Sequence, residues 1–183
     1  MTTIVERVYC FLVNNRLEYS ITSKSRNKYL VKPLIKGLIL DLIIGSLFAY
    51  FYSLNLISTF KLFIAILIGQ GILFYIPLIL LYINYYKSNK RTILKVEEDH
   101  FTFITKSTSH VVYIDEIDKV DLHVSIPKKS NRTIWFFWHK YFYIRVFTPS
   151  RDFIITCLIC EEFSDFYPEL NVSRIGHHMP LIK

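Results

Sequence analysis

The sequence predicts a membrane α-helical hairpin joined to a cytoplasmic α+β domain, an antiparallel seven-strand barrel or sandwich with a C-terminal helix. Two long apolar runs, Gly37–Leu54 and Leu62–Ile83, stand on either side of a short polar loop and predict the hairpin. From Thr92 the pattern changes to alternation with period two, broken by turn residues, and this predicts the strands.

These changes of pattern divide the 183 residues into three expected parts. Residues 1–36 form an N-terminal cytoplasmic segment, residues 37–86 form the hairpin, and residues 87–183 form a cytoplasmic β domain. The first segment holds seven basic and two acidic side chains, a net charge of +5. No apolar core before a cleavage site is visible there, so we expect no signal peptide.

The second apolar run is long enough to cross a bilayer, because about 20 residues rising about 1.5 Å each span about 30 Å. The loop expected at Asn55–Lys61 carries one lysine, whereas basic residues concentrate before the first run and after the second. Lysine and arginine stay on the cytoplasmic side, which places both termini in the cytoplasm and the protein in the inner membrane.

Small residues four positions apart predict where the two helices meet. Gly45 and Ala49 share one helical face, as do Ala65 and Gly69, and such spacing lets backbones approach closely. We expect packing within the hairpin, and a homo-oligomer through the same face is the alternative. Asp41 lies about one turn inside Lys36 and is expected at the membrane interface.

Seven strands are expected in the β domain, followed by a helix over Glu161–Leu170. The strands are Ile93–Glu97, His100–Lys106, Ser109–Ile114, Lys119–Val124, Thr133–Phe137, Lys140–Phe147 and Asp152–Cys157. Glu98-Asp99 and Thr148–Arg151 have the composition of turns.

Two stretches, "ILKVEEDHFTFITKSTSHVVYIDEIDKVDLHV" and "YFYIRVFTPSRDFIITCLICEEFSDFYPEL", resemble a bacterial pleckstrin-homology-like domain. The similarity lies in the spacing of apolar residues around Tyr113–Ile117 and Val120, and in the pair Phe163 and Phe166. With the hairpin, the chain resembles YcxB-like two-helix membrane proteins. The resemblance implies a PH-like fold and a membrane location, and it carries no catalytic residues to transfer.

The strongest candidate site is the aromatic and basic stretch "IPKKSNRTIWFFWHK". Tryptophan favours the headgroup layer and neighbouring lysines favour anionic lipid, so this stretch could bind the membrane surface or a protein partner. The alternative is that the protein's own helix or N-terminal segment covers the aromatic side chains. The candidate binding residues are Lys128, Lys129, Arg132, Trp135, Phe137, Trp138 and Lys140.

Other chemistry finds little support in the sequence. Cys157 and Cys160 have apolar neighbours and are expected to be packing residues, and His177 and His178 are expected in a solvated tail. No phosphate-binding glycine loop or nucleophile motif occurs. The carboxylates of Asp115, Glu116, Asp118 and Asp121 are expected at a turn, with no base, nucleophile or metal to pair with them. We therefore expect no enzyme activity, no metal, no cofactor and no nucleic-acid partner.

The expected function is recognition by a non-enzymatic membrane protein, whose PH-like domain binds a protein or the anionic lipid surface. Tethering to the bilayer would let even a weak site act. Two alternatives remain from the sequence. One is an immunity protein that protects against a membrane-acting or secreted toxin, and the other is an oligomeric transport component using Asp41 and Gln70.

Overall fold

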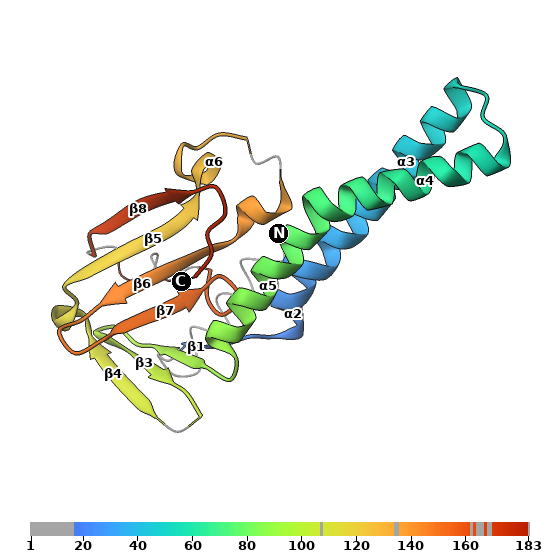
Figure 1. Ribbon diagram of the computed structural model, residues 1–183. Coiled ribbons are helices and arrows are strands. Elements are labelled where there is room, and N and C mark those ends of the chain that lie inside the picture. The colour runs from blue at the N-terminus through green and yellow to red at the C-terminus, as the bar shows by residue number, and fades with distance from the viewer. Residues whose placement is uncertain are drawn as a thin grey trace, which may run out of the picture.

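In the computed structural model a long helical hairpin projects from a β domain built of two sheets (Figure 1). The structure describes residues 17–106, 108–133, 136–161, 163, 167 and 170–182. The tip of the hairpin lies far from the sheets, whereas its base lies against them.

The first arm of the hairpin is formed by α2 (Ser23–Arg26), a π-helical turn η1 (Asn27–Val31) and α3 (Lys32–Phe51). The second is formed by α4 (Leu56–Gln70), a second π-helical turn η2 (Gly71–Tyr75) and α5 (Ile76–Asn89). Each π-helical turn precedes a proline, Pro33 or Pro77, in the first turn of the next helix. A proline cannot donate the usual helical hydrogen bond, and a wider turn accommodates that loss.

The connection at the tip is shorter than expected. Instead of a loop over Asn55–Lys61, α4 already begins at Leu56, because the Asn55 side chain caps the helix by accepting from the Ser58 amide at 2.9 Å. Ser58 and Thr59, which look like turn residues in the sequence, occupy the first helical turn.

The first sheet has the order β1-β2-β3-β4 and is antiparallel throughout. Its strands are β1 (Leu17–Ser20), β2 (Ile93–Val96), β3 (His100–Ile104) and β4 (Ser109–Tyr113). Strand β1 comes from the segment before the hairpin and pairs Leu17 with Val96. Residues on both sides of the hairpin in sequence therefore build one sheet.

The second sheet has the order β7-β6-β5-β8, with β8 parallel to β5 and the other pairs antiparallel. Its strands are β5 (Lys119–Ser125), β6 (Phe142–Phe147), β7 (Asp152–Thr156) and β8 (Val172–His177). Two short helical segments, α6 (Ile126–Lys129) and the 3-10 turn η4 (Phe137–Lys140), lie between β5 and β6 in sequence. A 3-10 turn η3 (Ile114–Glu116) leads from β4 toward β5.

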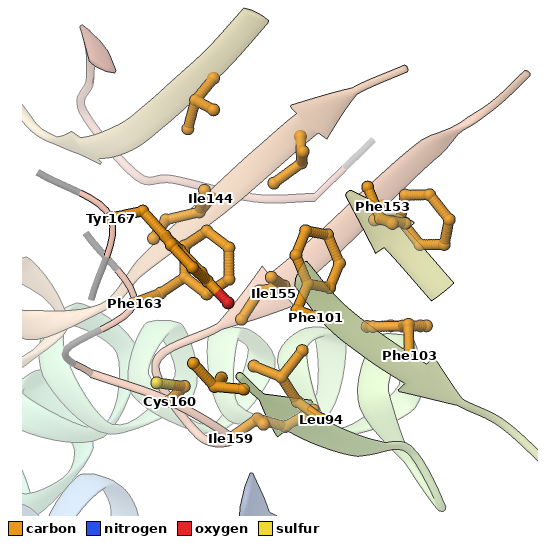
Figure 2. Packing of buried hydrophobic residues seen from close by; sticks show 14 residues of the cluster. Leu94, Phe101, Phe103, Ile144, Phe153, Ile155, Ile159, Cys160, Phe163 and Tyr167 are labelled. Carbon is orange, nitrogen blue, oxygen red and sulfur yellow. The ribbon is translucent and has the colours of Figure 1, made fainter. Parts of the chain in front are cut away.

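The main core fills the space between the two sheets (Figure 2). Phe101 and Phe103 of the first sheet meet Phe153 of the second, with ring centroids 5.9 and 5.5 Å apart. Phe163 and Tyr167 add their rings to this core, each with 1% of its surface exposed. Such edge-to-face aromatic packing supplies both buried area and a defined geometry.

Compared with the expectation, the eight strands in the described part of the chain form two separate sheets and not a closed barrel. Six expected strands are confirmed to within two residues at each end. The expected strand Thr133–Phe137 is wrong in its described residues, since Phe137 instead begins η4. Two strands, β1 and β8, were not expected. Most of the expected helix Glu161–Leu170 lies outside the described residues.

Candidate membrane-facing site at the base of the hairpin

The base of the hairpin is built into the β domain through a second hydrophobic cluster. Leu78, Leu81 and Tyr85 of α5 are fully buried. The Tyr85 ring meets Tyr141 edge-on at 5.2 Å, and Tyr141 in turn meets Tyr29 of η1 at 5.3 Å. Both arms of the hairpin therefore pack on the same part of the second sheet.

Directed hydrogen bonds fix this junction. The Asn89 amide nitrogen donates to the Ile154 carbonyl at 2.9 Å, while its oxygen accepts from the Thr156 amide at 3.0 Å. Tyr141 donates its hydroxyl to the Tyr29 carbonyl at 2.9 Å, and burial raises the pKa of that hydroxyl well above its usual range. Because buried backbone groups are costly to leave unpaired, these bonds set both the position and the orientation of α5 on the sheet.

One turn above this junction, aromatic side chains of the β domain contact the emerging helix. The rings of Phe136 and Trp138 stack at 4.4 Å with an angle of 3° between their planes. Phe74 of η2 lies 5.4 Å from the first ring and 5.8 Å from the second. Phe136 and Trp138 nevertheless retain exposed surface, with Phe136 36% exposed. We call Phe74, Phe136 and Trp138 the aromatic edge.

Basic residues precede and follow Phe136 and Trp138 in the sequence. Lys129, Arg132 and Lys140 are exposed, and Lys128 is half-buried with its ammonium 3.7 Å from the centre of the Phe142 ring. Burial lowers the pKa of Lys128. A cation above an aromatic face is favourable, and this contact holds the Lys128 ammonium against the Phe142 ring.

The structure therefore brings together most of the residues selected from the sequence. Lys128 and Lys129 lie on α6, whereas Phe137, Trp138 and Lys140 lie on η4, and the two segments pack on each other. Phe137 packs on the second cluster and supports the edge. Trp135 lies outside the described residues.

Three residues that build the junction and the aromatic edge were not selected from the sequence: Phe74, Tyr85 and Asn89. All three lie within or just after an apolar run, where they look like ordinary membrane residues or a helix end. The only available signal was the cluster of polar and aromatic residues at the end of the second run, "YINYYKSN". Such a cluster is unusual for a lipid-facing helix and indicates contact with protein.

Beyond the junction, the helices carry their apolar side chains on the outside. Ser23–Phe51 and Leu56–Asn89 are each long and apolar enough to cross a membrane, and only 17% and 11% of their most apolar windows lie buried. Leu56 is 86% exposed and Ile72 is 60% exposed. In water such a surface would be unstable, because contiguous exposed apolar patches on soluble proteins are small.

Of the four small residues expected to pack the hairpin, those on the first arm are buried or half-buried and those on the second arm are exposed. A Cβ atom on Gly45 would lie 2.5 Å from the Phe63 ring, so this glycine marks a close contact between the arms. Ala49 is half-buried, whereas Ala65 is exposed and Gly69 has open space around its Cα. The two pairs of small residues therefore do not face each other in this structure.

Asp41 is not at an exposed position but is buried between the arms, with 2% of its surface exposed. It accepts a hydrogen bond from the Tyr75 hydroxyl. Gly37, one turn earlier, faces the same tyrosine ring, where a Cβ would lie 2.7 Å from it. This contact links the two arms at the level of the aromatic edge, one residue from Phe74.

The two cysteines of the β domain are buried and lie in different clusters, Cys157 beside the hairpin base and Cys160 in the main core. Burial raises the pKa of the Cys157 thiol to about 12, so its reactive thiolate form is scarce at neutral pH. Their role as packing residues follows from these positions. Among the described residues no group of three or more histidine, cysteine and acidic side chains could hold a metal ion.

The arrangement defines a class: a long apolar hairpin whose base is locked into a β domain of two four-stranded sheets. A PH-domain family matches residues 18–164, which is most of the chain, and the chain belongs to this family. Comparison with curated proteins found no match, and neither did comparison with solved structures. PH-like domains in general bind proteins or lipids, and this directs attention to the exposed part of the aromatic edge.

Proposed function

We propose that the chain is a non-enzymatic, YcxB-like protein of the bacterial inner membrane whose PH-like domain binds the anionic surface of its own membrane. The hairpin crosses the bilayer, and the aromatic edge with its basic neighbours rests among the headgroups. The contact of Trp138 and Phe136 with Phe74 carries this proposal, because it places the domain's exposed aromatic rings beside the segment that emerges from the sheets.

The dimensions of the hairpin support this placement. Leu56–Tyr75 contains 20 residues, or about 30 Å of helix, which matches the thickness of the hydrocarbon core. At the tip, Tyr50, Phe51 and Tyr52 are 69% to 79% exposed, as expected for an aromatic belt in the opposite headgroup layer. Aromatic residues therefore stand at both ends of a segment of bilayer length.

Charge supports the orientation. The two arms of the hairpin both lead into the β domain at the base. Basic residues are far more frequent there, before α3 and after α5, than at the tip, where Lys61 is the only one. By the positive-inside rule the domain and both termini lie in the cytoplasm. The same leaflet carries the anionic lipid that attracts Lys129 and Arg132.

The proposal is tested by amide hydrogen exchange over residues 126–133 of the full-length protein. The chain is reconstituted in phosphatidylcholine nanodiscs with or without phosphatidylglycerol. We expect slower exchange with the anionic lipid, and high salt should remove the difference because surface charges are screened.

Charge reversal provides the matched control. Lys129→Glu with Arg132→Glu should abolish the lipid effect. Arg151→Glu, in the turn between β6 and β7 at the far end of the domain from the hairpin, should leave it intact (Figure 1). Equal exchange rates in both lipids would reject the proposal that this face binds anionic lipid. A single protein crosslinked at this face would indicate that it binds a protein partner.

A further inference from the structure

The end of the chain is fastened to the hairpin. Residues 178–182, here called the C-terminal strap, follow β8 and run along α5. Tyr85 donates its hydroxyl to the Pro180 carbonyl at 2.8 Å. The Asn84 side chain donates to the Ile182 carbonyl at 3.2 Å and accepts from the Ile182 amide at 3.0 Å. The strap therefore covers the face of α5 that seats the hairpin.

A pair of histidines holds the point where the strap leaves the sheet. His177, the last residue of β8, lies with its Nε2 atom 2.8 Å from Nδ1 of His123 on β5. The two rings are nearly parallel, and the His123 ring also stacks on Tyr143 at 4.3 Å with a 6° angle. Tyr143 contacts Tyr85 edge-on at 6.1 Å, so the pair is continuous with the junction. His177 is thus a residue of the sheet and not part of a solvated tail.

This contact has a strict proton requirement. A hydrogen bond between two ring nitrogens needs one N–H and one lone pair. The neutral pair meets that requirement, and so does the pair with one extra proton. When both rings are protonated, two N–H groups and two positive charges face each other at the same position, and the bond is lost. Among the described residues, His123 Nε2 is buried without a hydrogen-bond partner, so no second hydrogen bond of that ring replaces this one.

We propose that the His123–His177 pair is an acid-sensitive latch, which holds the strap on α5 and releases it when both imidazoles are protonated. The consequence is a change in how firmly the hairpin is seated on the β domain. The proposal concerns this attachment alone and does not depend on what the aromatic edge binds.

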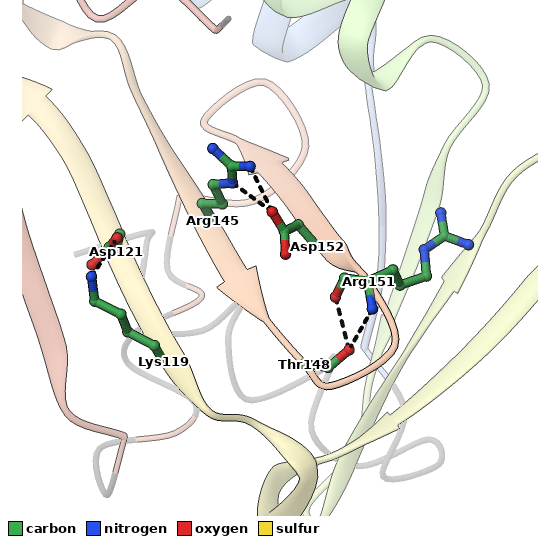
Figure 3. A network of polar contacts seen from close by, with 6 residues as sticks. All are labelled: Lys119, Asp121, Arg145, Thr148, Arg151 and Asp152. Atoms are coloured by element: carbon green, nitrogen blue, oxygen red, sulfur yellow. Dashed lines mark hydrogen bonds and ion pairs between the residues drawn. The ribbon is translucent and has the colours of Figure 1, made fainter.

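The surrounding groups determine the direction of the pH effect. Burial and the neighbouring His177 lower the pKa of His123, as do Arg145 on β6 and Lys119 on β5, whereas Asp121 opposes them. Figure 3 shows that Asp121 is engaged by Lys119 and that Arg145 is engaged by Asp152 on β7. Tyr143, stacked on the ring, carries no charge at neutral pH.

The sign follows from these directions. A released His123 takes up protons near the ordinary histidine pKa of about 6.5, while the latched one resists them. The latch is therefore at full strength above about pH 6.5. Below that value the equilibrium constant for attachment of the strap falls about tenfold per pH unit, until the latched pair itself takes up the second proton.

Hydrogen exchange of the full-length protein in nanodiscs tests the latch. Exchange is followed in the strap and in β8 from about pH 7.5 to about pH 5.5 and corrected for the intrinsic pH dependence of exchange. We expect protection of the strap to fall about tenfold or more at the acidic end, while strands β5 and β6 stay protected. Constant protection of the strap across this range overturns the proposal, with no variant needed.

Two substitutions separate the latch from general acid sensitivity. In His177→Gln the amide does not titrate and can bond to His123 in either protonation state, so the facing pair of charges cannot form. Burial still lowers the pKa of His123, so we expect strap protection to respond less steeply to pH than in the parent protein. His178→Gln changes the adjacent, exposed histidine and should keep the full response. An acid response of undiminished size in His177→Gln, or one that disappears in His178→Gln, contradicts the assignment.

Discussion

Substitution of Asn89 by alanine should detach the second arm of the hairpin from the β domain. The side chain is 1% exposed and satisfies two backbone groups of β7, the Ile154 carbonyl and the Thr156 amide. Without it both groups lose their partner at a position that water does not reach. Each unsatisfied buried group costs about 1–3 kcal/mol, so Asn89→Ala should lower the free energy of unfolding by about 2–6 kcal/mol.

The measurement is urea unfolding of the full-length protein in detergent micelles, followed by tryptophan fluorescence. Asn84→Ala is the matched control, since Asn84 makes the same pair of hydrogen bonds to Ile182 at a part-buried position where water can replace them. We expect Asn84→Ala to lower the free energy of unfolding by about 1 kcal/mol. Near-equal losses in the two variants, or a change below about 0.5 kcal/mol for Asn89→Ala, would refute the reasoning.

Two further predictions concern close packing and thiol chemistry. Gly45→Val should destabilise the hairpin because its side chain meets the Phe63 ring, whereas Gly69→Val at an open position should be tolerated, and thermal unfolding in micelles compares the two. Cys157, whose pKa is raised to about 12, should resist alkylation by iodoacetamide at about pH 8 in the folded protein and react once urea unfolds it, as mass spectrometry of the labelled peptides would show. Labelling of this residue in the folded protein at the rate of a free thiol would contradict its burial.

The parts of the fold that sequence could predict are those with a strong period. The two apolar runs predicted both arms of the hairpin, and the alternating segments from Ile93 to Thr156 predicted six strands to within two residues at each end, because burial on one or both faces leaves a visible pattern. The hairpin helices extend beyond the apolar runs, from Ser23 to Phe51 and from Leu56 to Asn89. The pattern fails where tertiary contacts decide. Strand β1 has four residues, and β8 lies at a sheet edge with only partial burial, so neither leaves a strong signal.

The aromatic stretch shows a different limit. Its composition drew attention to this region as a candidate site, but it could not reveal that Phe136 and Trp138 stack on each other and contact Phe74. That contact joins residues from two segments far apart in sequence. The loop at the tip was misassigned for a local reason, since Asn55 looks like a loop residue and acts as a helix cap.

The most direct test of the account is the depth of Trp138 in a bilayer. Trp135→Phe leaves Trp138 as the only tryptophan of the chain. Its fluorescence is measured in vesicles that contain lipids brominated at different depths. We expect strong quenching that is greatest for bromines nearest the headgroups, because we propose that the aromatic edge lies in that layer. Emission typical of a water-exposed indole, with no quenching from any depth, would contradict the proposal that this face of the PH-like domain rests on the membrane.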